Sequence, residues 1–123
     1  MITKEEIIKK SKQVDIDDFI IGHGSALVLH GIRESTNDID AGTDKETFKN
    51  LEGYVVELEN WKMIRNYQVD DFDIHLMENY DEYDYQLIEG VKVATPQQVI
   101  EDKKSLGRLK DWEQIKMIEK HLS

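Results

Sequence analysis

The chain has 123 residues, enough for one domain with a buried core but not for two. It has no cysteine, which excludes disulfides, thiolate catalysis and cysteine-ligated zinc or iron–sulfur sites. The formal net charge of −10 argues against binding of an extended nucleic acid, because most of the surface would repel phosphates. The same acidity suits divalent cations as partners, and it leaves room for a local basic pocket that holds a few phosphates.

The apolar runs are all much shorter than the roughly 20 residues that a membrane-spanning helix needs. The N-terminal segment is charged and lacks the apolar core of a signal peptide. We therefore expect a soluble, cytoplasmic protein without a membrane partner, built as a single domain over residues 1–123.

Short helices and strands alternate along the chain, and helices gather at its C-terminal end. In chain order, the patterns predict a helix over 4–13, a strand over 19–21, a helix over 26–30, a strand over 38–42, a helix over 44–52, strands over 54–58, 61–69 and 72–77, a hairpin over 86–94, and helices over 96–106 and 110–122. This order predicts an α+β fold, in which a small mixed β-sheet is flanked by helices.

Several of these helices start with a capping signal. Thr3 and Thr43 are each followed three residues later by glutamate, which is the spacing of a capping box. Ser25 is expected to cap the helix over 26–30. Thr95 is the clearest start, since proline occupies the first helical position after it.

Three aspartates, Asp38, Asp40 and Asp73, occupy strand positions between apolar or small neighbours. Asp38 and Asp40 should project from one face, because residues i and i+2 of a strand share a face. Two adjacent carboxylates repel each other and raise each other's pKa unless a cation lies between them. The pair is therefore either a metal site or a solvated strand end.

A glycine–serine turn, Gly24-Ser25, precedes the aspartate pair. Backbone N–H groups at such a turn can hold phosphate oxygens. Two aspartates can hold two Mg²⁺ ions over a triphosphate, and a third on a neighbouring strand can orient or deprotonate an attacking hydroxyl. Phosphoryl and nucleotidyl transfer use this combination of groups.

The motifs Gly24-Ser25, Asp38-Ile39-Asp40 and Phe72-Asp73-Ile74, in this order and spacing, resemble the signature of the nucleotidyltransferase superfamily that includes DNA polymerase β. Within it, the chain looks most like the minimal AbiEii-type nucleotidyltransferases. That closer resemblance lies in Ala26, His30-Gly31, Thr36 and Lys103…Arg108-Leu109-Lys110-Asp111.

The resemblance implies a nucleotidyltransferase-like fold in which Asp38, Asp40 and Asp73 are catalytic and hold Mg²⁺, two ions in all. It also implies nucleotide-binding roles for Gly24, Ser25, Lys103, Arg108 and Lys110. Helical phase leaves open whether Lys103 or Lys104 faces the site. We expect Asp111 to fix a neighbouring lysine or to cap the last helix.

The predicted function is Mg²⁺-dependent transfer of a nucleoside monophosphate from an NTP, such as ATP, to a hydroxyl acceptor, with release of pyrophosphate. The acceptor could be a small molecule, an RNA end or a protein, and it must lie against the C-terminal helices unless a homodimer completes the site. The alternative is a non-catalytic module of the antitoxin or regulator type that binds a nucleotide or a partner. Two departures favour it: His23 replaces the first of two glycines, and Glu34 replaces an arginine, with Arg33 one position away.

Overall fold

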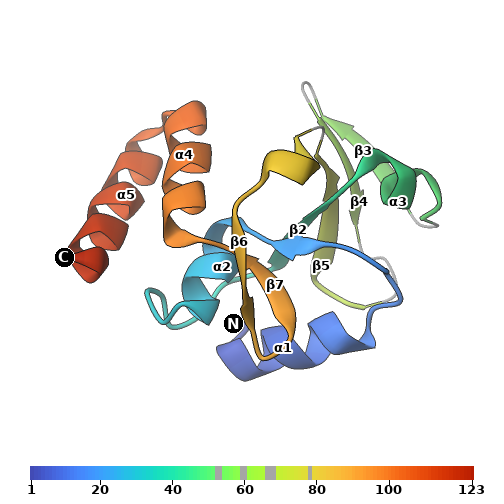
Figure 1. Cartoon of the computed structure of the whole chain (residues 1–123), viewed down its shortest axis with the longest axis horizontal. Helices are drawn as coiled ribbons and strands as arrows, with labels where there is room; N and C mark the ends of the chain where they lie inside the picture. Colours follow the sequence, from blue (N-terminus) through green and yellow to red (C-terminus); the bar gives the residue numbers. More distant parts are fainter. Residues whose placement is uncertain (52–53, 59–60, 66–68, 78) are drawn as a thin grey trace.

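The computed structural model spans residues 1–123 and describes all of them except 52–53, 59–60, 66–68 and 78, with the side chains of 54–58 and 61–65 outside the description. The elements in chain order are α1 (Lys4–Gln13), β1 (Ile20–Ile21), α2 (His23–Leu29), β2 (Ile39–Thr43), α3 (Lys45–Lys49), β3 (Tyr54–Leu58), β4 (Trp61–Arg65), β5 (Phe72–Leu76), the 3₁₀ turn η1 (Tyr80–Glu82), β6 (Tyr85–Ile88), β7 (Val91–Ala94), α4 (Pro96–Leu106) and α5 (Leu109–Leu122). Their arrangement is shown in Figure 1.

The strands form one mixed sheet of seven strands in the order β3-β4-β5-β2-β1-β7-β6. The pairs β2–β5 and β1–β7 are parallel, and the other neighbouring strands are antiparallel. The α+β class with a mixed sheet, predicted from the sequence, is confirmed.

The register between β2 and β5 separates an apolar face of the sheet from a polar one. Ile39 pairs with Phe72, and both side chains are fully buried in the core together with Ile7 of α1. Asp40 pairs with Asp73, one residue further along each strand. Since successive strand residues face opposite sides, the same pairing that builds the core directs two carboxylates to the other face.

Helices α4 and α5 lie side by side at one end of the molecule, and α4 also packs against α2 (Figure 1). Gly107 ends α4 with a φ of 64°, a left-handed conformation that glycine adopts without strain. The chain then turns so that Arg108 becomes the N-cap of α5. None of the helices that the structure describes is long and apolar enough to cross a bilayer.

The predicted cap of the second helix is wrong. Helix α2 begins at His23, after Gly22, so Ser25 lies inside the helix rather than before it. Its hydroxyl bonds instead to the backbone next to β2. A contact with a distant strand, which local spacing cannot reveal, therefore replaces the expected local cap.

The predicted capping box at Thr43 is also wrong by one residue. Thr43 is the last residue of β2, and its hydroxyl donates to the carbonyl of Asp18. Asp44 is the N-cap of α3, and its carboxylate accepts from the backbone N–H of Thr47 at 2.6 Å. At the first helix Thr3 is the N-cap as expected, but its hydroxyl contacts the Glu6 carboxylate at 3.4 Å and makes no hydrogen bond to the helix backbone.

The later elements follow the predictions closely. The hairpin spans β6 and β7, and both residues of its turn have positive φ, 49° at Glu89 and 83° at Gly90. The strand expected over 61–69 is β4, which ends at Arg65, and residues 66–68 lie outside the described part of the chain. The last two helices start at Pro96 and Leu109, within one residue of expectation.

Replacing Thr95 by alanine should lower the free energy of unfolding by about 1 kcal/mol, the usual cost of losing an N-cap hydroxyl. The Thr95 hydroxyl accepts from Gln98 N at 3.2 Å and donates to Asp84 at 2.8 Å. Urea denaturation checks this, with Thr95→Ser, which keeps the hydroxyl, as the matched control. Equal stability of Thr95→Ala and Thr95→Ser would contradict the role of the cap.

Candidate active site

Three carboxylates meet on the polar face of the sheet. One carboxylate oxygen from each of Asp38, Asp40 and Asp73 lies within 4.8 Å of the other two. Asp73 is only 5% exposed, and Asp38 and Asp40 are half-buried. The β2–β5 register brings Asp40 beside Asp73, and Asp38 precedes β2 on the same side by the two-residue period.

This cluster fits a divalent cation such as Mg²⁺. Carboxylate oxygens are the ligands that hard divalent cations prefer, and one or two carboxylates are enough for Mg²⁺. Three negative charges at this spacing repel one another, and a cation between them removes that cost. Asp38, Asp40 and Asp73 are therefore the residues that could hold metal.

Ser25 ties the start of α2 to the aspartate segment. Its hydroxyl donates to the carbonyl of Asp38 at 3.0 Å and accepts from the backbone N–H of Asp40 at 3.0 Å. The Gly22 N–H also donates to the Asp40 carbonyl, at 2.8 Å. Ser25 is fully buried, so in this structure its hydroxyl fixes the backbone between the two aspartates.

Gly24 lies directly under the Arg33 side chain. A Cβ at Gly24 would come within 2.7 Å of Arg33 Nη1 and 3.4 Å of Thr36 Oγ1. Only glycine therefore lets the guanidinium approach the start of α2. The family resemblance expects an arginine at position 34. Glu34, which occupies that position, is exposed, and the side chain of Arg33 lies against Gly24 instead.

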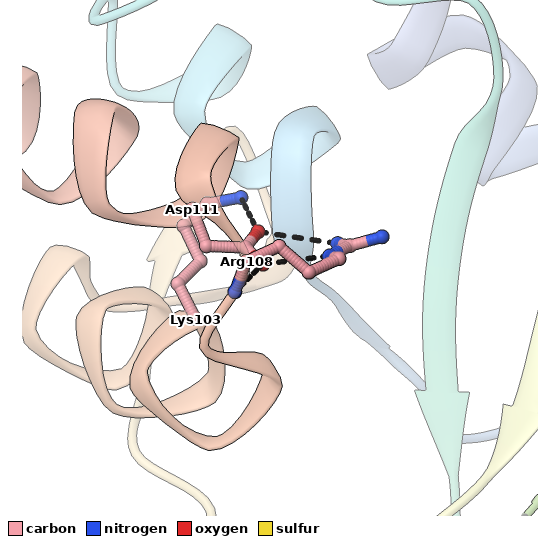
Figure 2. A network of polar contacts seen from close by, with 3 residues as sticks. All are labelled: Lys103, Arg108 and Asp111. Carbon is pink, nitrogen blue, oxygen red and sulfur yellow. Dashed lines mark hydrogen bonds and ion pairs between the residues drawn. The ribbon is translucent and has the colours of Figure 1, made fainter.

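Two cations of the late helices gather around one buried carboxylate (Figure 2). Arg108 Nε donates to Asp111 Oδ2 at 2.7 Å, and its Nη2 donates to Oδ1 at 3.1 Å. Lys103 Nζ lies 3.9 Å from Asp111 Oδ1. Asp111 is 1% exposed and Lys103 is 5% exposed, whereas Lys104 is exposed beside Glu101, so Lys103 is the inward-facing lysine.

Asp111 also caps α5, because its Oδ2 accepts the backbone N–H of Arg108 at 3.1 Å. The Arg108 hydrogen bonds hold the pKa of the Asp111 carboxyl below its ordinary value. The expectation that Asp111 fixes a lysine or caps the last helix is therefore confirmed, with Arg108 as a further partner.

Three positively charged residues lie close enough to lower the pKa of Lys103. Burial lowers the pKa of the Lys103 ammonium, Asp111 partly offsets this, and Arg108, Arg33 and Lys110 lower the pKa further. Lys110 itself is on the exposed surface of α5. The expected phosphate-binding cations Lys103, Arg108 and Lys110 therefore lie together near α4 and α5, with Arg33 close to them at the start of α2.

His23 adopts a φ of 49°, in the left-handed region that favours glycine, where the resemblance expects one. Its ring meets that of His75 edge-to-face, with 6.3 Å between centroids. Burial lowers the pKa of the His23 imidazole, Asp102 partly offsets this, and Lys103 lowers it again. The ring is therefore neutral at pH 7.

His30, by contrast, forms a hydrogen bond with the Ala94 carbonyl at 2.7 Å and so connects α2 to β7.

Replacing Ser25 by alanine should weaken Mn²⁺ or Mg²⁺ binding at the carboxylate cluster by at least tenfold, as loss of a group that orients metal ligands commonly does. Isothermal titration calorimetry measures the affinity, and thermal denaturation without metal shows whether the variant is folded. Ser105→Ala, which removes an exposed hydroxyl on α4, is the control. Unchanged affinity in a folded Ser25→Ala would contradict the positioning role.

Replacing Asp111 by asparagine should cost about 3 kcal/mol at pH 7, because it leaves the buried Lys103 without its counter-charge. The folded-state pKa of Asp111 lies below its ordinary value of 3.8, so its contribution is fully present above pH 3.8 and is lost as the pH falls through the folded value. The stability difference between wild type and variant should therefore shrink only below about pH 3.8. Urea titrations from pH 7 to pH 3 test this, with Glu113→Gln on the exposed surface of α5 as the control.

No family model matches the chain, and no curated protein sequence matches it. Among solved structures, it resembles a "putative nucleotidyltransferase (TM1012)" from Thermotoga maritima, with a TM-score of 0.52 and 16% sequence identity. The match covers 94% of this chain and 93% of the other. At this identity the likeness concerns the fold alone, and the chain therefore has a nucleotidyltransferase-like fold.

Proposed function

We propose that this protein is a Mg²⁺-dependent nucleotidyltransferase that moves a nucleoside monophosphate from an NTP to a hydroxyl acceptor and releases pyrophosphate. The observation that carries the proposal is the convergence of Asp38, Asp40 and Asp73, whose oxygens lie within 4.8 Å, on the sheet of a nucleotidyltransferase-like fold. A solvated strand end would be open to water, whereas Asp73 is 5% exposed beside two other carboxylates.

In this proposal Asp38, Asp40 and Asp73 hold the metal. Mg²⁺, when bound, would neutralise phosphate charge and polarise the reacting phosphoryl group. Asp73 orients the acceptor hydroxyl or takes its proton as the oxygen attacks the α-phosphorus and the bond to the pyrophosphate breaks. Ser25 keeps the two neighbouring aspartates at a fixed separation through the backbone.

The cations near α4, α5 and the start of α2 suit the triphosphate. Arg33 lies over Gly24, which precedes Ser25, the residue that bonds the aspartate segment. Lys103 and Arg108 are held by Asp111, with Lys110 near them. We assign the triphosphate to Gly24 and these cations, because a chain of phosphates on bound metal needs positive charge along its length.

The acceptor stays open among a small molecule, an RNA end and a protein side chain. The net charge of −10 disfavours a long nucleic-acid acceptor. An NTP-using enzyme of this kind would work in the cytoplasm, and a homodimer would supply a second surface for the acceptor.

A second candidate is a nucleotide-binding module without turnover. It is favoured by His23 and Glu34, which occupy positions where the resemblance expects a glycine and an arginine. Such a protein would bind a nucleotide and pass the signal to a partner.

One experiment separates these functions. Thermal stability is measured with Mg²⁺ and each NTP, and pyrophosphate release is measured with candidate acceptors, for wild type and the Asp38→Asn/Asp40→Asn variant. The enzyme should gain about 10 °C at an NTP concentration a hundred times Kd and release pyrophosphate, and the variant should lose both effects.

Asp81→Asn, which alters an exposed aspartate of η1, is the matched control and should behave as wild type. Stabilisation without pyrophosphate release across all acceptor classes would favour the binding module. No stabilisation by any Mg²⁺–NTP would contradict both nucleotide functions.

A further inference from the structure

A cavity of about 260 Å³ adjoins the carboxylate cluster on the polar face of the sheet. Asp40 forms part of its wall, together with His23 and His75. Tyr83 and the α4 residue Asp102 close the opposite side. The cavity is smaller than the 300–1,000 Å³ typical of sites that bury a drug-sized ligand, so it suits one part of a nucleotide rather than the whole.

The charge of the wall at Asp102 is unsuited to phosphate. Of the two aspartates among the described residues that line the cavity, Asp40 belongs to the carboxylate cluster and Asp102 does not. Tyr83 donates its hydroxyl proton to Asp102, and burial raises the pKa of the Tyr83 hydroxyl, so the tyrosine stays neutral. A phosphate beside Asp102 would face a carboxylate outside the metal cluster, whereas a neutral group with N–H donors would find an acceptor there.

The wall carries aromatic rings on which a flat ring could stack. The His23 and His75 rings meet edge-to-face at 6.3 Å, and Tyr83 adds a third aromatic ring. Aromatic faces of this kind stack on nucleobases, and stacking tolerates any base. Discrimination must therefore come from polar groups of the wall, and among its described residues Asp102 is the charged one outside the metal cluster.

Asp102 can accept a further hydrogen bond. Its Oδ2 accepts from Tyr83, and its Oδ1 accepts from Gln98 Nε2 at 3.2 Å. Each carboxylate oxygen has two lone pairs, so acceptor capacity remains for a ligand. A carboxylate reads an exocyclic amino group and is repelled by a carbonyl oxygen in the same place.

Asp102 and Lys103 are consecutive on α4, so this helix contributes one residue to the cavity wall and the next to the cation cluster. A single nucleotide could place its phosphates on the cations and its base in the cavity. We infer that the cavity binds the base of the donor nucleotide and that Asp102 selects bases with an exocyclic amino group. This inference rests on the proposed nucleotide-binding function.

The test compares nucleotides that differ only at that group. Calorimetry with Mg²⁺ and without acceptor measures the affinity for ATP against ITP and for CTP against UTP, and inorganic tripolyphosphate reports the phosphate contribution alone. The aminated nucleotide of each pair should bind roughly tenfold more tightly, the effect of one hydrogen bond to a charged acceptor. Asp102→Asn should bring both ratios close to one.

A second pair of variants tests the location. Ser105 lines the cavity from the exposed side of α4, so Ser105→Trp should obstruct it and lower ATP affinity at least tenfold while leaving tripolyphosphate affinity unchanged. Lys104→Trp puts the same side chain one residue away, outside the described lining, and should bind ATP as wild type does.

Each outcome decides between the hypotheses. Equal affinities within both nucleotide pairs, or equal effects of Ser105→Trp and Lys104→Trp, would overturn the base-binding inference while leaving nucleotide binding intact. Discrimination seen only with free adenosine against inosine, and not with ATP against ITP, would assign the cavity to an acceptor's base and overturn the inference as stated. Absence of binding by every nucleotide and by tripolyphosphate would overturn the proposed function and this inference with it.

Discussion

The parallel pairing of β2 with β5 is the constraint on which the candidate site depends. This register pairs Ile39 with Phe72 on one face of the sheet and Asp40 with Asp73 on the other. Burial of the apolar pair favours this register, and a slip by one residue would turn the carboxylates into the core. The hydrophobic core thus holds two carboxylates side by side, where both can act on one divalent cation.

The charges of the molecule are separated in a way that suits a polyphosphate on a metal. Carboxylates lie on the sheet, whereas Lys103 and Arg108 lie on the late helices with Arg33 near them. Asp111 restrains two of these cations, so their positions are set before any ligand arrives. Pre-organised charge of this kind lowers the cost of binding, because fewer side chains must be ordered by the ligand.

Local patterns were sufficient for most of the fold and for the carboxylates. The two-residue period of β5 and the Asp38-Ile39-Asp40 spacing are properties of single strands, so they can be read from the sequence. The hydrogen bonds of Ser25 and the approach of Arg33 to Gly24 join segments separated by a loop. Their geometry depends on how α2 packs on β2, which no local spacing specifies. The cavity wall likewise depends on tertiary packing, because it joins Tyr83 to Asp102 of α4 through a hydrogen bond.

The structure changes how the two departures from the family pattern, Glu34 and His23, bear on phosphate binding. Glu34 is exposed, and Arg33 brings positive charge to the turn from the preceding position, so the missing arginine is replaced by its neighbour. His23 adopts a left-handed φ of 49°, and burial lowers the pKa of its imidazole, so the neutral ring adds no positive charge for a phosphate. Its ring instead forms part of the cavity wall beside Asp40. If the cavity binds a base as we infer, the histidine at a glycine position supplies an aromatic surface to it and is compatible with a working nucleotide site.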